Sequence, residues 1–237
     1  MAKKHNDFIF ETIGNKTTLI RDFEGMYRDC EDPHGQSKAI QTLSYQLVLS
    51  TVERTVEMVK RGPNSTVTIM DMGCGLGYFT KLLKKKFPAA DVRGADISSA
   101  ALAKASRRAP ECVFQQIDLK TQDPLDLRIQ FDVMIALDCL YYFNNDEILQ
   151  VLANIRKLMV DGGFLVVGYH LPETMNFGLY IRCLNDAKSL FQSCGLSIVY
   201  SFDVEDNLDI TYTGTPVGRH LYFLAKKLSG VKRVLTS

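Results

Sequence analysis

The chain has 237 residues, of which 46% are hydrophobic and 23% charged, and its formal net charge is +1. This length suits one α/β domain with a modest extension and leaves little room for two full domains. The near-zero charge gives no indication of a nucleic-acid partner, and no apolar run approaches the ~20 residues that a membrane-spanning helix requires. The N-terminus lacks the hydrophobic centre of a signal peptide, and the six cysteines have no metal-binding spacing. We therefore expect a cytoplasmic protein with reduced thiols and no resident metal.

Residues 1–62 are expected to form an N-terminal helical cap. Apolar residues are scattered up to a D-P-H-G turn at Asp32–Gly35, and from Gln36 to Lys60 they recur at the three- and four-residue spacing of a helix. Two interpretations of this segment stay open. It either packs on the sheet as a helical layer, or it forms a lid over a ligand at the mouth of the sheet.

A glycine-rich stretch follows the first core strand, in the sequence V-T-I-M-D-M-G-C-G-L-G-Y-F from Val67 to Phe79. The apolar start predicts a strand, the alternating glycines a tight turn, and Tyr78–Phe87 a helix. Glycine has no Cβ and accepts positive φ, so such a turn lets the backbone and the helix N-terminal amides approach a ligand closely.

The residues around the glycines argue against a dinucleotide. The dinucleotide fingerprint G-x-G-x-x-G places a glycine where Tyr78 stands here. Asp71 lies two residues before the first glycine, where a carboxylate would repel a pyrophosphate but tolerate a positive or zwitterionic head. A nicotinamide oxidoreductase is therefore disfavoured.

The chain then alternates strands and helices, which predicts a doubly wound α/β fold. We expect strands at Asp91–Ile97, Cys112–Leu119, Phe131–Asp138 and Phe164–Gly168. Helices are expected at Ala100–Arg108, Asn145–Met159 and Thr174–Cys194. Two last strands, Leu196–Asp203 and Gly218–Lys227, are expected to pair as an antiparallel hairpin. The expected domain spans residues 63–228, and residues 229–237 form a tail.

Acidic residues follow several of these strands, and ligands of parallel sheets gather at that edge. Asp96 stands 21 residues after Gly75, close to the ~20-residue offset at which an acidic group reaches ribose hydroxyls. Asp118 ends the next strand. Asp138 ends the strand expected at Phe131–Asp138, and Tyr142 follows it.

The D-x-G-C-G-x-G motif, together with F-D-V and D-G-G-x-L further on, resembles class I S-adenosylmethionine-dependent methyltransferases. The resemblance covers residues 67–168 and implies a seven-stranded, mostly parallel, Rossmann-like sheet. It implies S-adenosylmethionine as cofactor, with S-adenosylhomocysteine as product, and Asp118 and Leu119 as contacts to adenine. The cofactor-binding residues expected from the motifs and the resemblance are Asp71, Gly73, Cys74, Gly75, Gly77, Tyr78, Asp96, Ile97, Asp118, Leu119, Leu137 and Tyr27.

The segment Tyr27 to Pro33 resembles the Y-x-x-x-x-D-P motif of small bacterial nodulation-factor and amino-sugar N-methyltransferases, although His34 replaces the usual aromatic residue. The expected catalytic residues are His170, Tyr142 and His34, with His170 the first choice for general base. The expected reaction methylates an O or N atom of a small molecule, such as a sugar derivative, a nucleotide sugar or another metabolite. A cofactor-binding partner without catalysis and a protein or RNA methyltransferase stay open as alternatives.

Overall fold

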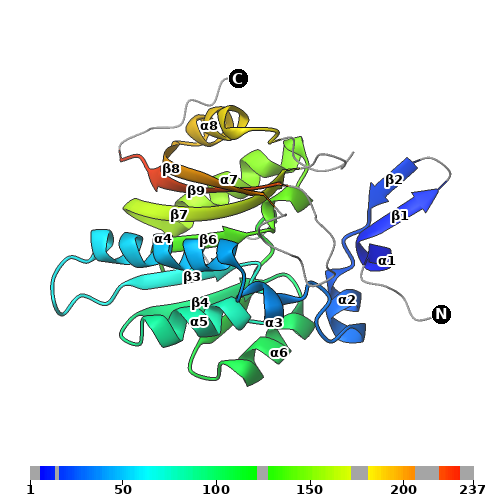
Figure 1. The fold of residues 1–237 in the computed structure, drawn as a ribbon, viewed down its shortest axis with the longest axis horizontal. Helices are drawn as coiled ribbons and strands as arrows, with labels where there is room; N and C mark the ends of the chain where they lie inside the picture. Colours follow the sequence, from blue (N-terminus) through cyan, green and yellow to red (C-terminus); the bar gives the residue numbers. More distant parts are fainter. Residues whose placement is uncertain (1–5, 14–15, 122–127, 172–180, 206–218, 230–237) are drawn as a thin grey trace.

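A single mixed sheet forms the centre of the protein (Figure 1). The computed structural model describes residues 6–13, 16–121, 128–171, 181–205 and 219–229, and seven strands of these residues make up the sheet. In spatial order they are β5 (Val113–Gln116), β4 (Asp91–Asp96), β3 (Thr68–Met72), β6 (Phe131–Leu137), β7 (Met159–Leu171), β9 (Arg219–Lys227) and β8 (Leu196–Glu205). The first five are parallel, and β9 is antiparallel to both of its neighbours. The predicted fold class is confirmed.

Helices cover the sheet on both faces, which explains why β6 is apolar along its length and buried at every residue. The helices that follow the N-terminal segment are α4 (Leu43–Val59), α5 (Tyr78–Lys86), α6 (Ser99–Arg108), α7 (Asn145–Leu158) and α8 (Leu184–Ser193). Side chains alternate along each strand, so Val133 packs with α4 and α5 while Met134 packs with α7 and α8. The core therefore has two layers, one on each face of the sheet.

The N-terminal segment lies beside the glycine-rich loop (Figure 1). It contains α1 (Asn6–Ile9), β1 (Phe10–Ile13), β2 (Lys16–Leu19), α2 (Phe23–Asp29) and α3 (Gln36–Ala39). Phe8, Met26 and Tyr27 are buried in one cluster with Leu76 and Ala101 of the sheet domain. The antiparallel β1–β2 hairpin was not indicated by the sequence pattern, because its strands are only four residues long.

Several predicted element boundaries are wrong, and the largest differences concern three elements. The helix expected over Gln36–Lys60 is interrupted at residues 40–42, where Thr42 adopts an extended backbone and its side chain accepts the Tyr45 amide to begin α4. The strand expected at Phe164–Gly168 runs from Met159 to Leu171, because β9 pairs with its last eight residues. The helix expected from Thr174 begins only at Leu184, and residues 172–180 lie outside the described part of the chain.

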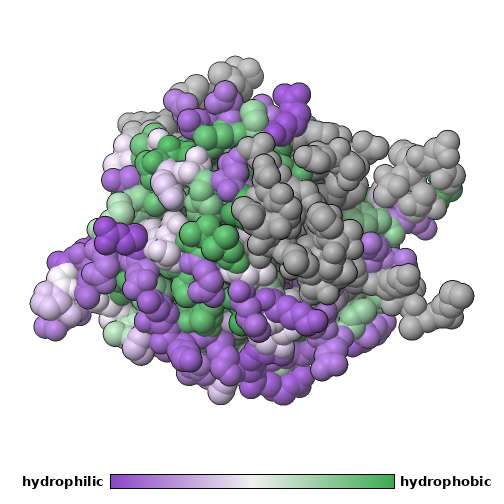
Figure 2. All heavy atoms as spheres, in the orientation of Figure 1, coloured by the Kyte–Doolittle hydropathy of each residue, from purple (hydrophilic) through white to green (hydrophobic). Residues whose placement is uncertain are grey.

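The surface of the described residues is mixed in polarity. Figure 2 shows hydrophilic side chains over the lower part of one face, where α5 and α6 lie, and hydrophobic ones nearer to α4 and the strands beyond it. Leu43 and Leu47 of α4 are exposed apolar residues. Within the described ranges, the helices are all too short or too polar to cross a membrane.

The packing of α7 makes a prediction about stability. Leu152 is fully buried between α7 and the sheet, whereas Leu149 on the same helix is 50% exposed. Leu152→Ala is expected to lower the free energy of unfolding by about 2–5 kcal/mol, because it removes buried methyl groups and leaves a cavity. Leu149→Ala is the matched control and should cost about 0.5 kcal/mol or less. Urea unfolding followed by circular dichroism measures both, and equal losses would contradict this packing.

Candidate active site

The glycine-rich loop is fixed by the carboxylate at the end of β4. Gly73, Gly75 and Gly77 all have positive φ, between 52° and 74°, so the loop requires glycine at these positions. Asp96 Oδ2 accepts a hydrogen bond from the Gly75 amide at 2.8 Å, and its Oδ1 accepts one from the Ser98 amide at 2.9 Å. Burial raises the pKa of Asp96. A carboxylate offers about four lone-pair sites, so Asp96 can still accept a hydrogen bond from a ligand.

Asp71 has a different surrounding, beneath the loop. Its side chain is 3% exposed and accepts a hydrogen bond from the Thr80 hydroxyl at 2.6 Å. Burial, together with the charge of Asp96, raises the pKa of Asp71 to about 7. The structure thus places this predicted contact residue in a supporting position, where it anchors the first turn of α5 to the end of β3.

A large cavity of about 1020 Å³ opens where β3, β4 and β6 end. A site for one small molecule measures about 300–1,000 Å³, so this cavity has room for a cofactor and an acceptor together. Nine of the predicted site residues in the described chain line it and come from the sheet edge or the N-terminal segment: Tyr27, His34, Gly73, Asp96, Ile97, Asp118, Leu119, Leu137 and Tyr142. His170, the predicted base, lines it as well.

The remaining predicted contacts do not reach the cavity. Gly75, Cys74 and Asp71 are buried and do not line it, and burial holds the pKa of the Cys74 thiol well above its usual range. Gly77 packs against α6, where an added Cβ would lie 2.8 Å from the Ala105 Cβ. The guanidinium carbon of Arg108 lies over the Tyr78 ring, 3.8 Å from the centroid of that ring. Gly77 and Tyr78 thus pack the loop and the start of α5 against α6.

Two side chains of the N-terminal segment cover the loop from the cavity side. The Gln36 side-chain oxygen accepts the Leu76 amide at 2.7 Å, and its amide nitrogen lies 3.5 Å from the Cys74 carbonyl as a donor. A Cβ on Gly75 would lie 2.6 Å from the Tyr27 hydroxyl and 2.5 Å from Gln36. Glycine at position 75 is therefore needed for the segment to close on the loop.

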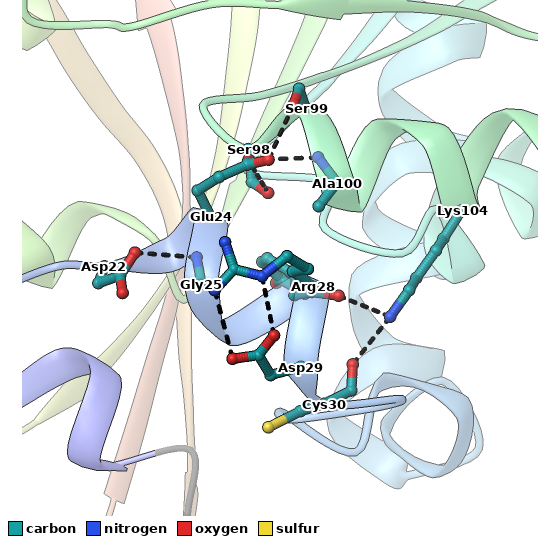
Figure 3. A network of polar contacts seen from close by, with 11 residues as sticks. Asp22, Glu24, Gly25, Arg28, Asp29, Cys30, Ser98, Ser99, Ala100 and Lys104 are labelled. Atoms are coloured by element: carbon teal, nitrogen blue, oxygen red, sulfur yellow. Dashed lines mark hydrogen bonds and ion pairs between the residues drawn. The ribbon is translucent and has the colours of Figure 1, made fainter. Parts of the chain in front are cut away.

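Complementary charges at helix ends hold α2 against α6, as Figure 3 shows. Glu24 accepts hydrogen bonds from the Ser98 and Ser99 hydroxyls and the Ala100 amide at the N-terminus of α6. Lys104 donates to the Tyr27 and Cys30 carbonyls at the C-terminus of α2. Each charge is opposite in sign to the end of the helix dipole that it contacts, which is a favourable interaction. The two helices therefore hold each other in place.

A second ionic contact joins the segment to α7. Glu147 pairs with Arg21 at 2.9 Å and with Lys120 at 3.0 Å. The hydrogen bond from Arg21 is the main reason that the pKa of Glu147 is lowered to about 2. Arg21 and Lys120 both line the cavity, so this contact closes its rim on the side of Asp118.

Aromatic and imidazole rings form another part of the cavity wall. The Tyr141 and Tyr142 rings lie 4.4 Å apart, and the Tyr142 ring meets Phe23 edge-on at 4.9 Å. The His34 ring lies 6.0 Å from the Tyr27 ring. The strand expected here ended at Gly168, but the structure places His170 within β7, directly opposite His220 of β9, and the two ring centroids are 4.7 Å apart.

Comparison with known proteins identifies the domain. Residues 70–165 match the family model described as a methyltransferase domain. This part of the chain is similar to known methyltransferase domains. The expected resemblance to S-adenosylmethionine-dependent methyltransferases is thereby confirmed.

Curated relatives match this methyltransferase domain over part of their length. Malonyl-[acyl-carrier protein] O-methyltransferase of Paenibacillus sp. (strain JDR-2) is 26% identical, over 67% of this chain and 56% of its own. Trans-aconitate 2-methyltransferase of Variovorax paradoxus (strain S110) is 33% identical, over 47% of this chain and 42% of its own. The chain thus spans about half the length of these relatives.

A solved structure supports the fold. The N-methyltransferase NodS from Bradyrhizobium japonicum WM9, in complex with S-adenosyl-L-homocysteine, aligns with a TM-score of 0.65 at 15% identity. The alignment covers 86% of this chain and 98% of that structure. The similarity extends through most of the chain, although identity this low establishes the fold alone.

The residues of the methyltransferase domain fit its cofactor. Asp96 presents a carboxylate with free lone pairs to the cavity, as two ribose hydroxyls require. Ile97, Leu119 and Leu137 supply apolar surface beside it.

Sequence reasoning missed several residues of the cavity. Gln36 belongs to no recognisable sequence motif. Arg21 and Lys120 are far from Glu147 in sequence, and only the fold brings them to it. His220 lies opposite His170 through strand pairing that the pattern of either strand alone does not specify. The prediction of an antiparallel hairpin could have suggested a partner for β7, but not its register.

Asp71 makes the stability of the methyltransferase domain depend on pH. Its folded-state pKa of about 7 exceeds the ordinary 3.8, so the folded protein binds more protons than the unfolded one between these values. The contribution of Asp71 to stability therefore falls as pH rises through this window. Asp71→Asn keeps an acceptor for Thr80 but does not ionise. Relative to the wild type, it should gain stability between pH 4 and pH 8, by the order of 2–4 kcal/mol.

Urea unfolding of the wild type and of Asp71→Asn at both pH values measures this gain. A stability difference that is the same at pH 4 and pH 8 would contradict the raised pKa. Comparing the two proteins cancels the contributions of other titrating groups.

Proposed function

We propose that this protein transfers a methyl group from S-adenosylmethionine to an oxygen or nitrogen atom of a small molecule. The main support is the cavity of about 1020 Å³, which joins an acidic sheet edge to an aromatic and imidazole wall. When bound, the cofactor supplies a sulfonium methyl group, whose carbon–sulfur bond breaks with its electron pair left on sulfur as the acceptor atom bonds the carbon.

The sheet edge is proposed to hold the nucleoside. Asp96 accepts hydrogen bonds from the ribose hydroxyls, and Asp118 accepts one from the exocyclic amine of adenine. Asp118 is held for this by the Lys120 amide and the Thr121 hydroxyl, which donate to its two oxygens at 2.9 and 2.7 Å. Ile97 and Leu137 cover the faces of the nucleoside. These contacts orient the cofactor before any chemistry takes place.

The aromatic wall is proposed to hold the acceptor and to exclude water. Tyr27, Tyr141 and Tyr142 are ring systems that favour a cation nearby, and they enclose the acceptor space together with His34 and His170. The N-terminal segment, fixed by Glu24, closes this space and limits the acceptor to a small molecule. The free cysteines of the chain suit a reducing compartment, and we infer a cytoplasmic enzyme.

Cofactor binding is tested by titration calorimetry. S-adenosylhomocysteine is expected to bind the wild type, and NAD is not. Asp96→Ala should weaken S-adenosylhomocysteine binding by roughly 10- to 100-fold, because losing a buried hydrogen-bond acceptor costs about 1–3 kcal/mol. Asp91→Ala, at the other end of the same strand, is the matched control and should leave the affinity unchanged.

The outcomes separate the candidate functions. Binding of NAD in place of S-adenosylhomocysteine would contradict the proposal. Transfer of a labelled methyl group to members of an acceptor panel of amines, alcohols and carboxylic acids distinguishes an enzyme from a partner subunit that only binds the cofactor. Methylation confined to protein or RNA acceptors would contradict the proposal that the acceptor is a small molecule.

A further inference from the structure

We propose that His220, paired with Asp138, takes the proton that the acceptor loses, and that the acceptor is therefore an amine or a hydroxyl compound. This proposal rests on the proposed methyl transfer and specifies its substrate class. It assigns the role to a residue on the antiparallel strand β9, which carries none of the family motif.

Strand pairing brings the imidazoles together. His170 of β7 and His220 of β9 are register partners, so their side chains emerge on the same face of the sheet. Both line the cavity, and the His220 ring also stacks on Tyr222 with an interplanar angle of 20°. These two ring contacts restrain the orientation of the His220 ring.

Asp138 faces His220 from the end of β6. Its backbone is left-handed, with φ of 52°, and its amide donates to the Gly168 carbonyl at 3.0 Å. Its Oδ1 atom is buried and has no hydrogen-bond partner among the described residues, but it lies 3.8 Å from Nε2 of His220. A strained residue that holds a buried carboxylate oxygen toward an imidazole suggests a functional arrangement.

The pair suits the charge that develops during methyl transfer. As a bond forms between an N–H or O–H acceptor and the methyl carbon, the proton leaves the acceptor and joins a lone pair of the His220 imidazole. The resulting imidazolium lies within ion-pair distance of Asp138, so the buried positive charge is compensated. A carboxylate acceptor has no proton to lose at neutral pH, so its methylation would not require a base such as His220 paired with Asp138.

Other groups at this end of the cavity are poorer bases. Burial raises the pKa of Tyr141 well above its usual value, and it raises that of the Cys139 thiol also. Both therefore stay protonated near pH 7. Tyr141 donates its hydroxyl proton to the Tyr142 oxygen at 3.2 Å. In the proposed arrangement an imidazole therefore receives the proton, and the Asp138 carboxylate pairs with the resulting charge.

Two variants test the pair by turnover on an amine or alcohol that the acceptor panel identifies. His220→Ala should lower kcat by about 10²-fold or more, with S-adenosylhomocysteine affinity unchanged, and added imidazole should restore part of the loss. Asp138→Asn should lower kcat as well, and asparagine accepts the left-handed backbone at position 138. Full activity of His220→Ala with a loss in His170→Ala would overturn the assignment, as would a panel in which only carboxylic acids are methylated.

A spectroscopic test needs no acceptor. The chain has four histidines, so protein labelled with ¹⁵N-histidine gives four sets of imidazole signals, assigned with single His variants. Asp138→Asn should change the ¹⁵N shifts of His220. Asp161→Asn, which removes a carboxylate paired with Lys227 at the other end of β9, should not. Sinefungin, which carries an amino group in place of the sulfonium methyl, should shift His220 more than S-adenosylhomocysteine does.

Calorimetry with the same two ligands separates the possible failures. If both ligands bind and His220 responds neither to sinefungin nor to Asp138→Asn, the inference is wrong and the proposed function stands. If neither ligand binds, the proposed function fails and the inference fails with it.

Discussion

The hydrogen bond from the Gly75 amide to Asp96 is the contact on which the rest of the site depends. It joins the loop after β3 to the end of β4, so two neighbouring strands present one continuous edge. Because Asp96 also accepts the Ser98 amide, the same carboxylate fixes the start of α6. Glu24 then binds the first turn of α6 and brings in the N-terminal segment. A single buried carboxylate thus links the loop, a helix and the cover of the cavity.

Buried acidic groups at this edge carry a cost in stability. Asp71 and Asp96 both have raised pKa values, chiefly because burial removes water from the charged form, and the charge of Asp96 adds to the effect on Asp71. Hydrogen bonds from Thr80 and from backbone amides offset part of this cost. An arrangement of this kind is expected where a binding site needs negative charge in a fixed position.

The sequence predicted most of the α/β core because its signals are local. The apolar run of β6, the glycines of the loop and the cap at Ser98 each act within a few residues, and the structure agrees with them. Asp96 and Asp118 were predicted from strand ends, spacing and the family resemblance, and both line the cavity. By contrast, Gln36 and His220 meet the site through long-range pairing and packing, which a periodic pattern does not specify. The same is true of the contact between Asp138 and His220. Asp71 was predicted as a ligand contact, but its depth below the loop depends on packing around Thr80.

The central claim is that this acidic edge holds an adenosyl ligand whose reacting end faces the imidazole wall. A crystal structure of the protein with S-adenosylhomocysteine tests this most directly. The account predicts the ribose hydroxyls on Asp96, the adenine beside Asp118, and the sulfur on the side of Tyr142 and His220. A nucleoside bound away from Asp96, or one with its sulfur turned from the imidazoles, would contradict it.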